Sequence, residues 1–447
     1  IIQQGDALLD LGRTAEAEAR YRVVVDQLRG TPDALQPAPQ SDPAPVFEVI
    51  EPWRAWTGLA RALQIEGRLD EALELAREVE TQRPDVLQTP LLVGDLLRAQ
   101  GDFDGAQQAY ARAVAVAPRS PVPVARQAAT YLLSGDLTGA QERFEAALNL
   151  DPTNADALLG LAQAYAQAGG GTSAVEFRKA ESRLKEAIDF APDNLTPYQA
   201  LGDLYLAYDR PDDAVAEYEK ARQLASTDLL TLGRLGTALL AAGKAEEAIA
   251  VFEQRVTQAP EDKGALLDLA AAYREVGEYE SAETAYNQLL VLSPDDLGIK
   301  ISLGDLYVEQ DQAERALPLY EEAATRASDP DQLAQARDQL GKAALRLGDA
   351  SRAESLAASL IETRPELTRG YLLLAAVREA QGDQDGALAV YSDGITKTDD
   401  PLPLQLRAGD LLLRLGRAPE AQALLDEAVR NNPRAPEAYI GLALSHI

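Results

Sequence analysis

The feature that most constrains the fold of this chain is a sequence repeat of 34 residues. A small residue and a proline, Ala106 and Pro118, return one period later as Ala140 and Pro152. A period of this length is typical of stacked helix-turn-helix units, each of which buries its apolar face against its neighbours. We therefore expect a helical solenoid, built as one elongated domain without a central core.

One unit, residues 87–120, shows how the repeat encodes two helices. Each half of the unit carries small or apolar residues at helical spacing, and these are Pro90, Gly94 and Leu97 in the first half and Ala106, Tyr110 and Ala113 in the second. Gly101 lies between the halves and is expected to end the first helix, because glycine tolerates the left-handed conformation found there. Pro118 is expected to stop the second helix.

This pattern resembles the tetratricopeptide repeat family over nearly the whole chain, with about twelve repeats. If Trp53 is position 1 of a repeat, further repeats start at residues 87, 121, 155, 195, 229, 263, 297, 334, 368 and 402. Position 20 is then alanine in every repeat, from Ala72 to Ala421. The resemblance implies an all-α fold, a right-handed superhelical solenoid of antiparallel helix pairs whose first helices line the concave face.

The same alignment divides the chain into segments. Residues 1–31 form a first repeat with a truncated start, 32–52 a proline-rich insert, 53–435 eleven repeats, and 436–447 the first helix of a further, truncated repeat. The insert is read as a linker, or as an extended segment pressed onto the solenoid through its apolar residues Val46, Phe47, Val49 and Ile50. In the repeat that starts at 155, six extra residues lengthen the turn, and Thr172 or Ser173 is expected to cap a longer second helix.

Composition excludes several classes of function. The chain has no cysteine, which removes disulfides and thiolate chemistry, and its formal net charge of −30 argues against nucleic acid and anionic membranes as partners. No segment is apolar for long enough to span a membrane. The single histidine, His446, is expected to pack in the last helix, and no GxxxxGK[ST] phosphate loop is present. We therefore predict no catalytic residue, no metal site and no cofactor.

A longer period is superimposed on the 34 residues. Four repeats carry Gly-Asp at positions 8 and 9, whereas the repeat before each has alanine at position 8; the dipeptides are Gly94-Asp95, Gly202-Asp203, Gly304-Asp305 and Gly409-Asp410. We interpret this as amplification of a block of three repeats, although Gly5-Asp6 does not fit the phase.

In the resembled family, positions 2, 5, 9, 12 and 13 of the first helices usually meet the ligand, and here positions 5, 9 and 12 are considered. Carried over to this chain, they predict an apolar groove with aspartates set into it, formed by Leu91, Asp95, Leu132, Leu159, Asp203, Leu206, Leu240, Leu267, Ile301, Asp305, Val308, Leu345, Leu372, Leu406, Asp410 and Leu413. Such a groove suits a basic or amphipathic peptide or partner helix. Alternatively, the aspartates pair with arginines of the next repeat, as Asp95 with Arg126 and Asp203 with Arg234.

Three functions from different classes remain open. The first is a non-catalytic scaffold that binds a protein or peptide in the groove, and acidic C-terminal tails are not expected there because positions 5 and 9 are mostly leucine and aspartate. The second is a structural protein that self-associates through open solenoid ends, at Ile1 and Ile2 and at Leu442 and Ala443. The third is the targeting arm of a larger enzyme. Bacterial envelope or extracellular proteins are a setting implied by the resemblance alone.

Overall fold

The computed structural model describes residues 1–29, 35 and 51–445, and this part of the chain consists of 25 helices without a strand. The prediction of an all-α helical repeat is therefore confirmed for these residues. The chain forms two compact units, Ile1–Ala238 and Leu239–Ile447, with the boundary inside α13 (Leu229–Ala241). A solenoid can divide in this way because each repeat contacts only its neighbours.

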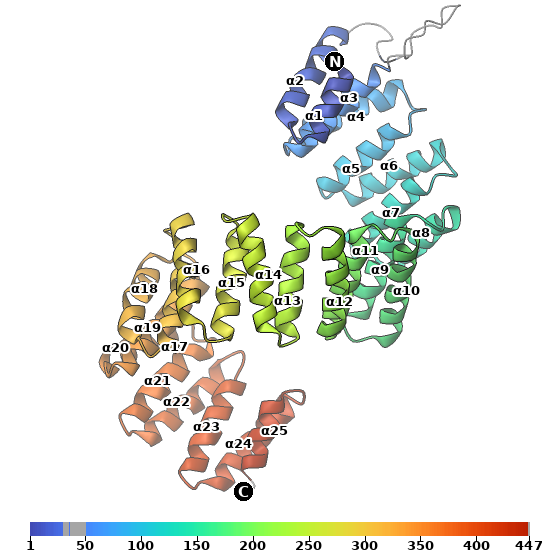
Figure 1. Cartoon of the computed structure of the whole chain (residues 1–447). Coiled ribbons are helices and arrows are strands. Elements are labelled where there is room, and N and C mark those ends of the chain that lie inside the picture. Colours follow the sequence, from blue (N-terminus) through green and yellow to red (C-terminus); the bar gives the residue numbers. More distant parts are fainter. Residues whose placement is uncertain (30–34, 36–50, 446–447) are drawn as a thin grey trace, which may run out of the picture. The chain divides into compact units, whose positions relative to one another are not determined.

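In the first unit, helix pairs follow one another in chain order (Figure 1). The first helices of its repeats are α1 (Ile2–Asp10), α3 (Trp53–Ile65), α5 (Gln88–Ala99), α7 (Pro121–Leu133), α9 (Ala155–Gly169) and α11 (Leu195–Ala207). The second helices are α2 (Thr14–Leu28), α4 (Leu69–Gln82), α6 (Phe103–Val116), α8 (Leu137–Leu150), α10 (Ala174–Phe190) and α12 (Pro211–Leu224).

The second unit is built in the same way. Its first helices are α15 (Lys263–Glu275), α17 (Leu297–Glu309), α19 (Pro330–Arg346), α21 (Thr368–Ala380), α23 (Leu402–Arg414) and α25 (Pro436–Leu444). Its second helices are α14 (Ala245–Gln258), α16 (Tyr279–Leu292), α18 (Ala313–Arg326), α20 (Ala350–Thr363), α22 (Gln384–Lys397) and α24 (Ala418–Asn431).

Helix starts follow the predicted period. Of the eleven first helices from α3 to α23, ten begin within one residue of a predicted repeat start, and α19 begins four residues early, at Pro330. In the repeat at 155, the hydroxyl of Ser173 caps a 17-residue α10, as predicted. His446, together with Val46, Phe47, Val49 and Ile50 of the insert, lies outside the described residues.

Small residues set the distance between the two helices of a repeat. The alanines at position 20, from Ala72 to Ala421, are all fully buried, so the backbones approach closely at this level. Gly101 has a φ of 82°, which is the left-handed conformation predicted for the turn. Two repeats place aspartate at this turn, Asp209 and Asp311, with φ of 55° and 61°.

First helices also contact the first helices of neighbouring repeats, as α3 does with α1 and α5 in the first unit and α21 does with α19 and α23 in the second. Neighbouring first helices thus lie side by side and form a shared face in each unit. We refer to this surface as the first-helix face.

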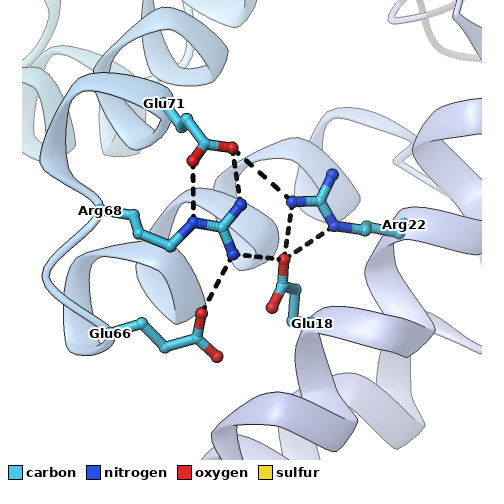
Figure 2. Close-up of polar contacts among 5 residues, drawn as sticks. All are labelled: Glu18, Arg22, Glu66, Arg68 and Glu71. Atoms are coloured by element: carbon cyan, nitrogen blue, oxygen red, sulfur yellow. Dashed lines mark hydrogen bonds and ion pairs between the residues drawn. The ribbon is translucent and has the colours of Figure 1, made fainter.

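A network of ion pairs connects the first repeat to the second, the repeat that follows the insert in the sequence (Figure 2). Glu18 of α2 accepts from Arg22 of its own helix at 2.6 Å and from Arg68, the residue before α4, at 2.9 Å. Arg68 also pairs with Glu71 at 2.6 Å and with Glu66 at 3.2 Å. Burial raises the pKa of Glu18, but the hydrogen bonds and charges of the two arginines outweigh it and hold that pKa below its ordinary value.

Candidate functional site

The first-helix face contains several hollows, and three of them bring predicted groove residues together. In the first unit, Leu91 and Asp95 line a hollow of about 450 Å³, and Leu159 and Asp203 line another of about 410 Å³. In the second unit, α19, α21 and α23 surround a hollow of about 630 Å³, and we refer to it as the α19–α23 hollow. Its walls include three predicted residues, namely Leu345, Leu372 and Asp410.

The other predicted residues lie on first helices without lining these hollows. Leu132 and Ile301 are buried in the packing between helices, whereas Leu267 is exposed. The remainder are half-buried, and they are Leu206, Leu240, Asp305, Val308, Leu406 and Leu413.

Three of the four predicted aspartates are held by a tyrosine of the same repeat. The phenol of Tyr110 donates to Asp95 at 2.7 Å, that of Tyr218 to Asp203 at 2.6 Å, and that of Tyr320 to Asp305 at 2.6 Å. Burial raises the pKa of each tyrosine above its ordinary value, and the carboxylate raises it further. The phenols therefore remain protonated and serve as hydrogen-bond donors.

Arginines of the following repeat complete two of these sites. Arg126 pairs with Asp95, and Arg234 pairs with Asp203 at 3.1 Å. The ion pairs considered as the alternative in the sequence analysis are thus present in the structure. Asp6 is held in the same manner, by Tyr21 at 2.6 Å and by Arg54 of the next repeat at 3.2 Å.

The glycine before each of these aspartates leaves space for the tyrosine ring. A Cβ added to Gly94 would lie 2.4 Å from the ring of Tyr110, and one added to Gly202 or Gly304 would lie 2.6 Å from its tyrosine. Glycine, aspartate and the tyrosine fifteen residues after the aspartate therefore form one contact. The glycine makes room for the aromatic ring, and the aspartate accepts the hydrogen bond of the phenol. That tyrosine follows Asp6 as well, so the contact accounts for Gly5-Asp6, which the three-repeat block left unexplained.

Repeats with alanine at position 8 use another partner for their tyrosine. In the repeat that starts at 368, Ala375 replaces the glycine, and Tyr391 donates to Glu379 at 2.8 Å, three positions beyond the place of the aspartate. In the repeat that starts at 263, the partner of Tyr286 is Arg274, also at position 12.

Asp410 is the exception among the predicted aspartates. The residue fifteen positions later is Leu425, which is buried and offers no hydrogen bond. Asp410 is exposed and pairs with Arg414 of its own helix at 3.2 Å. Of the four, it is thus the aspartate most accessible to a partner.

Basic side chains around the α19–α23 hollow were missed by the sequence analysis. Lys342, Arg346, Arg407 and Arg414 line it, together with two acidic residues, Glu379 and Asp410. They occupy positions 6, 9 and 13 of their repeats, whereas the prediction concentrated on positions 5, 9 and 12. Comparing position 13 of one repeat with position 6 two repeats later would have revealed Arg346 and Arg407.

The arrangement supports binding by apolar contact and by charge. Among the described residues, no three His, Asp or Glu side chains are grouped so that they could hold a metal ion. Nor does any described helix combine the length and apolar character required to cross a membrane.

Family models described as tetratricopeptide repeat match most of the chain. One matches residues 91–133, 339–400 and 406–447, another 131–177 and 239–300, and a third 2–22 and 53–78. A search of the curated proteins returned no match.

Solved structures similar to this chain include a tetratricopeptide repeat protein from Parabacteroides merdae, with 18% identity and a TM-score of 0.45, covering 57% of this chain and 99% of that chain. Yeast Tom70 has 11% identity and a TM-score of 0.44, with 88% and 95% covered. Pseudomonas aeruginosa pilF has 20% identity and a TM-score of 0.38, with 51% and 97% covered.

Proposed function

Because the chain belongs to the tetratricopeptide repeat family, whose arrays are in general protein–protein interaction scaffolds, we propose that it binds a peptide or a partner helix on its first-helix face. The observation that carries the proposal is the clustering of predicted groove residues, such as Leu345 and Leu372, around hollows on that face. These half-buried leucines offer apolar surface to a partner, and no catalytic step is part of the proposal.

The internal contacts of the aspartates narrow the set of groups on the first-helix face that can recognise a ligand. Asp95 and Asp203 already accept a phenol hydrogen bond and an arginine ion pair, so much of their negative charge is satisfied within the solenoid. Leucines, together with charges that lack such partners, are then the groups left to recognise a ligand. An amphipathic helix or an extended peptide with apolar side chains fits these requirements.

A basic or amphipathic partner is best supported at the start of the first unit. A hollow of about 740 Å³ lies there between α1, α3 and the segment before α5. Its charged lining comprises four acidic and two basic side chains, which are Asp6, Asp10, Glu51 and Asp85, and Arg54 and Arg61. An excess of carboxylates attracts cationic side chains and repels anionic ones.

The proposal is tested with a panel of fluorescent peptides that combine leucine with lysine, with glutamate or with both, titrated with the full chain. We expect at least one class to bind, and Leu91→Asp or Leu372→Asp to weaken binding by about tenfold, since each change puts a charge into an apolar contact. Val291→Asp is the matched control, because Val291 lies on the second helix α16 and is 80% exposed. Equal losses from all three variants would contradict binding on the first-helix face, as would a panel in which no peptide binds.

A further inference from the structure

The α19–α23 hollow is basic in a chain whose formal net charge is −30. Four cationic and two anionic side chains line it, and its apolar lining consists of Leu345, Leu372, Leu373 and Ala376. Leu373 is buried, while the other three are half-buried and reach the surface. The hollow thus combines apolar surface with positive charge.

Two of the cations are already engaged with carboxylates. Arg414 donates to Glu379 at 2.6 Å and pairs with Asp410 at 3.2 Å. Lys342 donates at 2.7 Å to Asp338, a buried residue of the same helix. These charges are largely neutralised within the protein.

The other two cations have no such neutralisation. Arg346 donates to a neutral group, the backbone carbonyl of Val308, at 3.0 Å. Arg407 makes no hydrogen bond or ion pair with any residue that the structure describes. Both side chains are exposed, so their guanidinium groups are accessible to a ligand.

Neither acidic residue of the hollow neutralises Arg346 or Arg407, because both carboxylates are engaged elsewhere. Glu379 is held by the phenol of the buried Tyr391 at 2.8 Å and by Arg414. Asp410 is paired with Arg414. Arg346 and Arg407 therefore remain as the two donors of the hollow that lack a carboxylate acceptor.

We propose that the α19–α23 hollow binds an acidic peptide segment whose carboxylates meet Arg346 and Arg407 while an apolar side chain rests on Leu345 and Leu372. Guanidinium groups bind carboxylates through paired hydrogen bonds, which gives such contacts both strength and direction. This inference rests on the proposed function and names the partner of one of its sites. It departs from the sequence analysis, which expected no acidic partner from the residues at positions 5 and 9.

A peptide fits the hollow better than a nucleic acid or a membrane surface. Binding to a polyanion depends on many phosphate contacts from clustered cations, and here only two cations lack an internal carboxylate partner. An acidic chain would also repel an extended polyanion beyond the hollow. The apolar residues between the arginines match a leucine or phenylalanine side chain, which a phosphate backbone does not carry.

The probe is a fluorescein-labelled peptide of sequence Asp-Glu-Leu-Phe-Glu-Asp, titrated with the full chain and followed by fluorescence anisotropy. Arg346→Gln/Arg407→Gln should weaken binding by about tenfold, since it removes both charge-assisted contacts to the carboxylates of the peptide. The control Arg143→Gln/Arg434→Gln removes the same charge from exposed residues that line none of the hollows and should change affinity by less than about twofold. Raising the salt from about 0.1 M to about 1 M should also weaken binding, because it shortens the Debye length from about 10 to about 3 Å.

Each other outcome overturns the inference in a distinguishable way. Equal losses from the two double variants would mean that overall charge, and not the hollow, governs binding. Binding of a uridine homopolymer or of phosphatidylserine vesicles with the same dependence on Arg346 and Arg407, without binding of the peptide, would identify a polyanion site. If only lysine-containing peptides bind and Leu372→Asp abolishes that binding, the acidic partner is wrong while the proposed function stands. If no peptide binds at all, both fail.

Discussion

Two repeats of this solenoid share the dipeptide Gly-Asp at the same positions and use it differently. In the repeat of α5 and α6, Asp95 accepts a hydrogen bond from Tyr110, and its side chain is 17% exposed. In the repeat of α23 and α24, the side chain of Asp410 is 61% exposed and pairs with an arginine of its own helix. The difference comes from the residue fifteen positions later, Tyr110 in one case and Leu425 in the other. The role of a repeated aspartate is thus decided by the second helix.

The same comparison extends to the glycines. A Cβ at Gly94 would lie 2.4 Å from the aromatic ring of Tyr110, which is fully buried and cannot easily move. A Cβ at Gly409 would lie 2.9 Å from the terminal methyl Cδ2 and from Cγ of Leu425. A leucine end group adjusts to such a contact more readily than an aromatic ring held by a hydrogen bond.

The largest expected effect is that of Tyr110→Phe. It removes a hydrogen bond to a charged and half-buried carboxylate, so the free energy of local opening in α5 and α6 should fall by about 2 kcal/mol. Amide hydrogen exchange with mass spectrometry measures α5–α6 and α23–α24 in one sample, so the second pair is an internal control. Equal protection of α5 and α6 in variant and parent would show that the hydrogen bond adds nothing to stability.

Gly94→Ala should have the next largest effect. Crowding against the ring costs about 1–3 kcal/mol, and the better helix propensity of alanine returns about 1 kcal/mol, so a net loss of about 1 kcal/mol is expected in α5 and α6. Gly409→Ala should leave α23 and α24 unchanged or stabilise them. The comparison breaks down if both substitutions have the same sign in hydrogen exchange.

A smaller difference is expected between the contributions of Asp95 and Asp410 to the free energy of unfolding, and a double-mutant cycle measures the part that Asp95 shares with Arg126. Asp95→Asn and Arg126→Gln should couple by about 0.5–1 kcal/mol, because the two side chains form a partly buried ion pair between repeats. Asp410→Asn should cost less than about 0.5 kcal/mol, since its pair is exposed and lies within one helix. Urea unfolding of single and double variants measures both, and a coupling energy near zero for Asp95 and Arg126 would remove the contrast.

The smallest expected effect is on the dependence of folding stability on pH. The pKa of Glu18 lies below its ordinary value, so its contribution to folding is present above the pKa of an unfolded glutamate and is lost as pH falls through its folded pKa. Between neutral pH and about pH 3, the parent should therefore lose more stability than Arg68→Gln, which lacks one of the two arginines. Arg434→Gln, which removes an exposed arginine outside this network, should show the same acid dependence as the parent. Identical pH profiles of urea midpoints for the parent and Arg68→Gln would contradict the role of the network in Figure 2.

Much of the fold could be predicted from local sequence alone. Helix starts, the left-handed turn at Gly101 and the buried alanine at position 20 depend on residues within one repeat, so a 34-residue pattern contains their causes. The tyrosine contact was also open to prediction, because a tyrosine follows Asp6, Asp95, Asp203 and Asp305 by the same fifteen residues and is absent only after Asp410.

The candidate site was less predictable, because its composition arises between repeats. Arg346 and Arg407 are 61 residues apart in the sequence and meet in one hollow because α19, α21 and α23 lie side by side. Within any one repeat, the spacing of residues carries no information on the charges that a second repeat brings to the same hollow.

The repeat, its helices and the positions of its small residues follow from spacing along one chain segment. Contacts between segments in three dimensions establish which aspartates are satisfied internally and which arginines are not. Hydrogen bonds and ion pairs act over a few ångströms in space, and their partners come from different helices and different repeats. For that reason the same two letters, Gly-Asp, stabilise the solenoid at Asp95 and leave Asp410 at the surface.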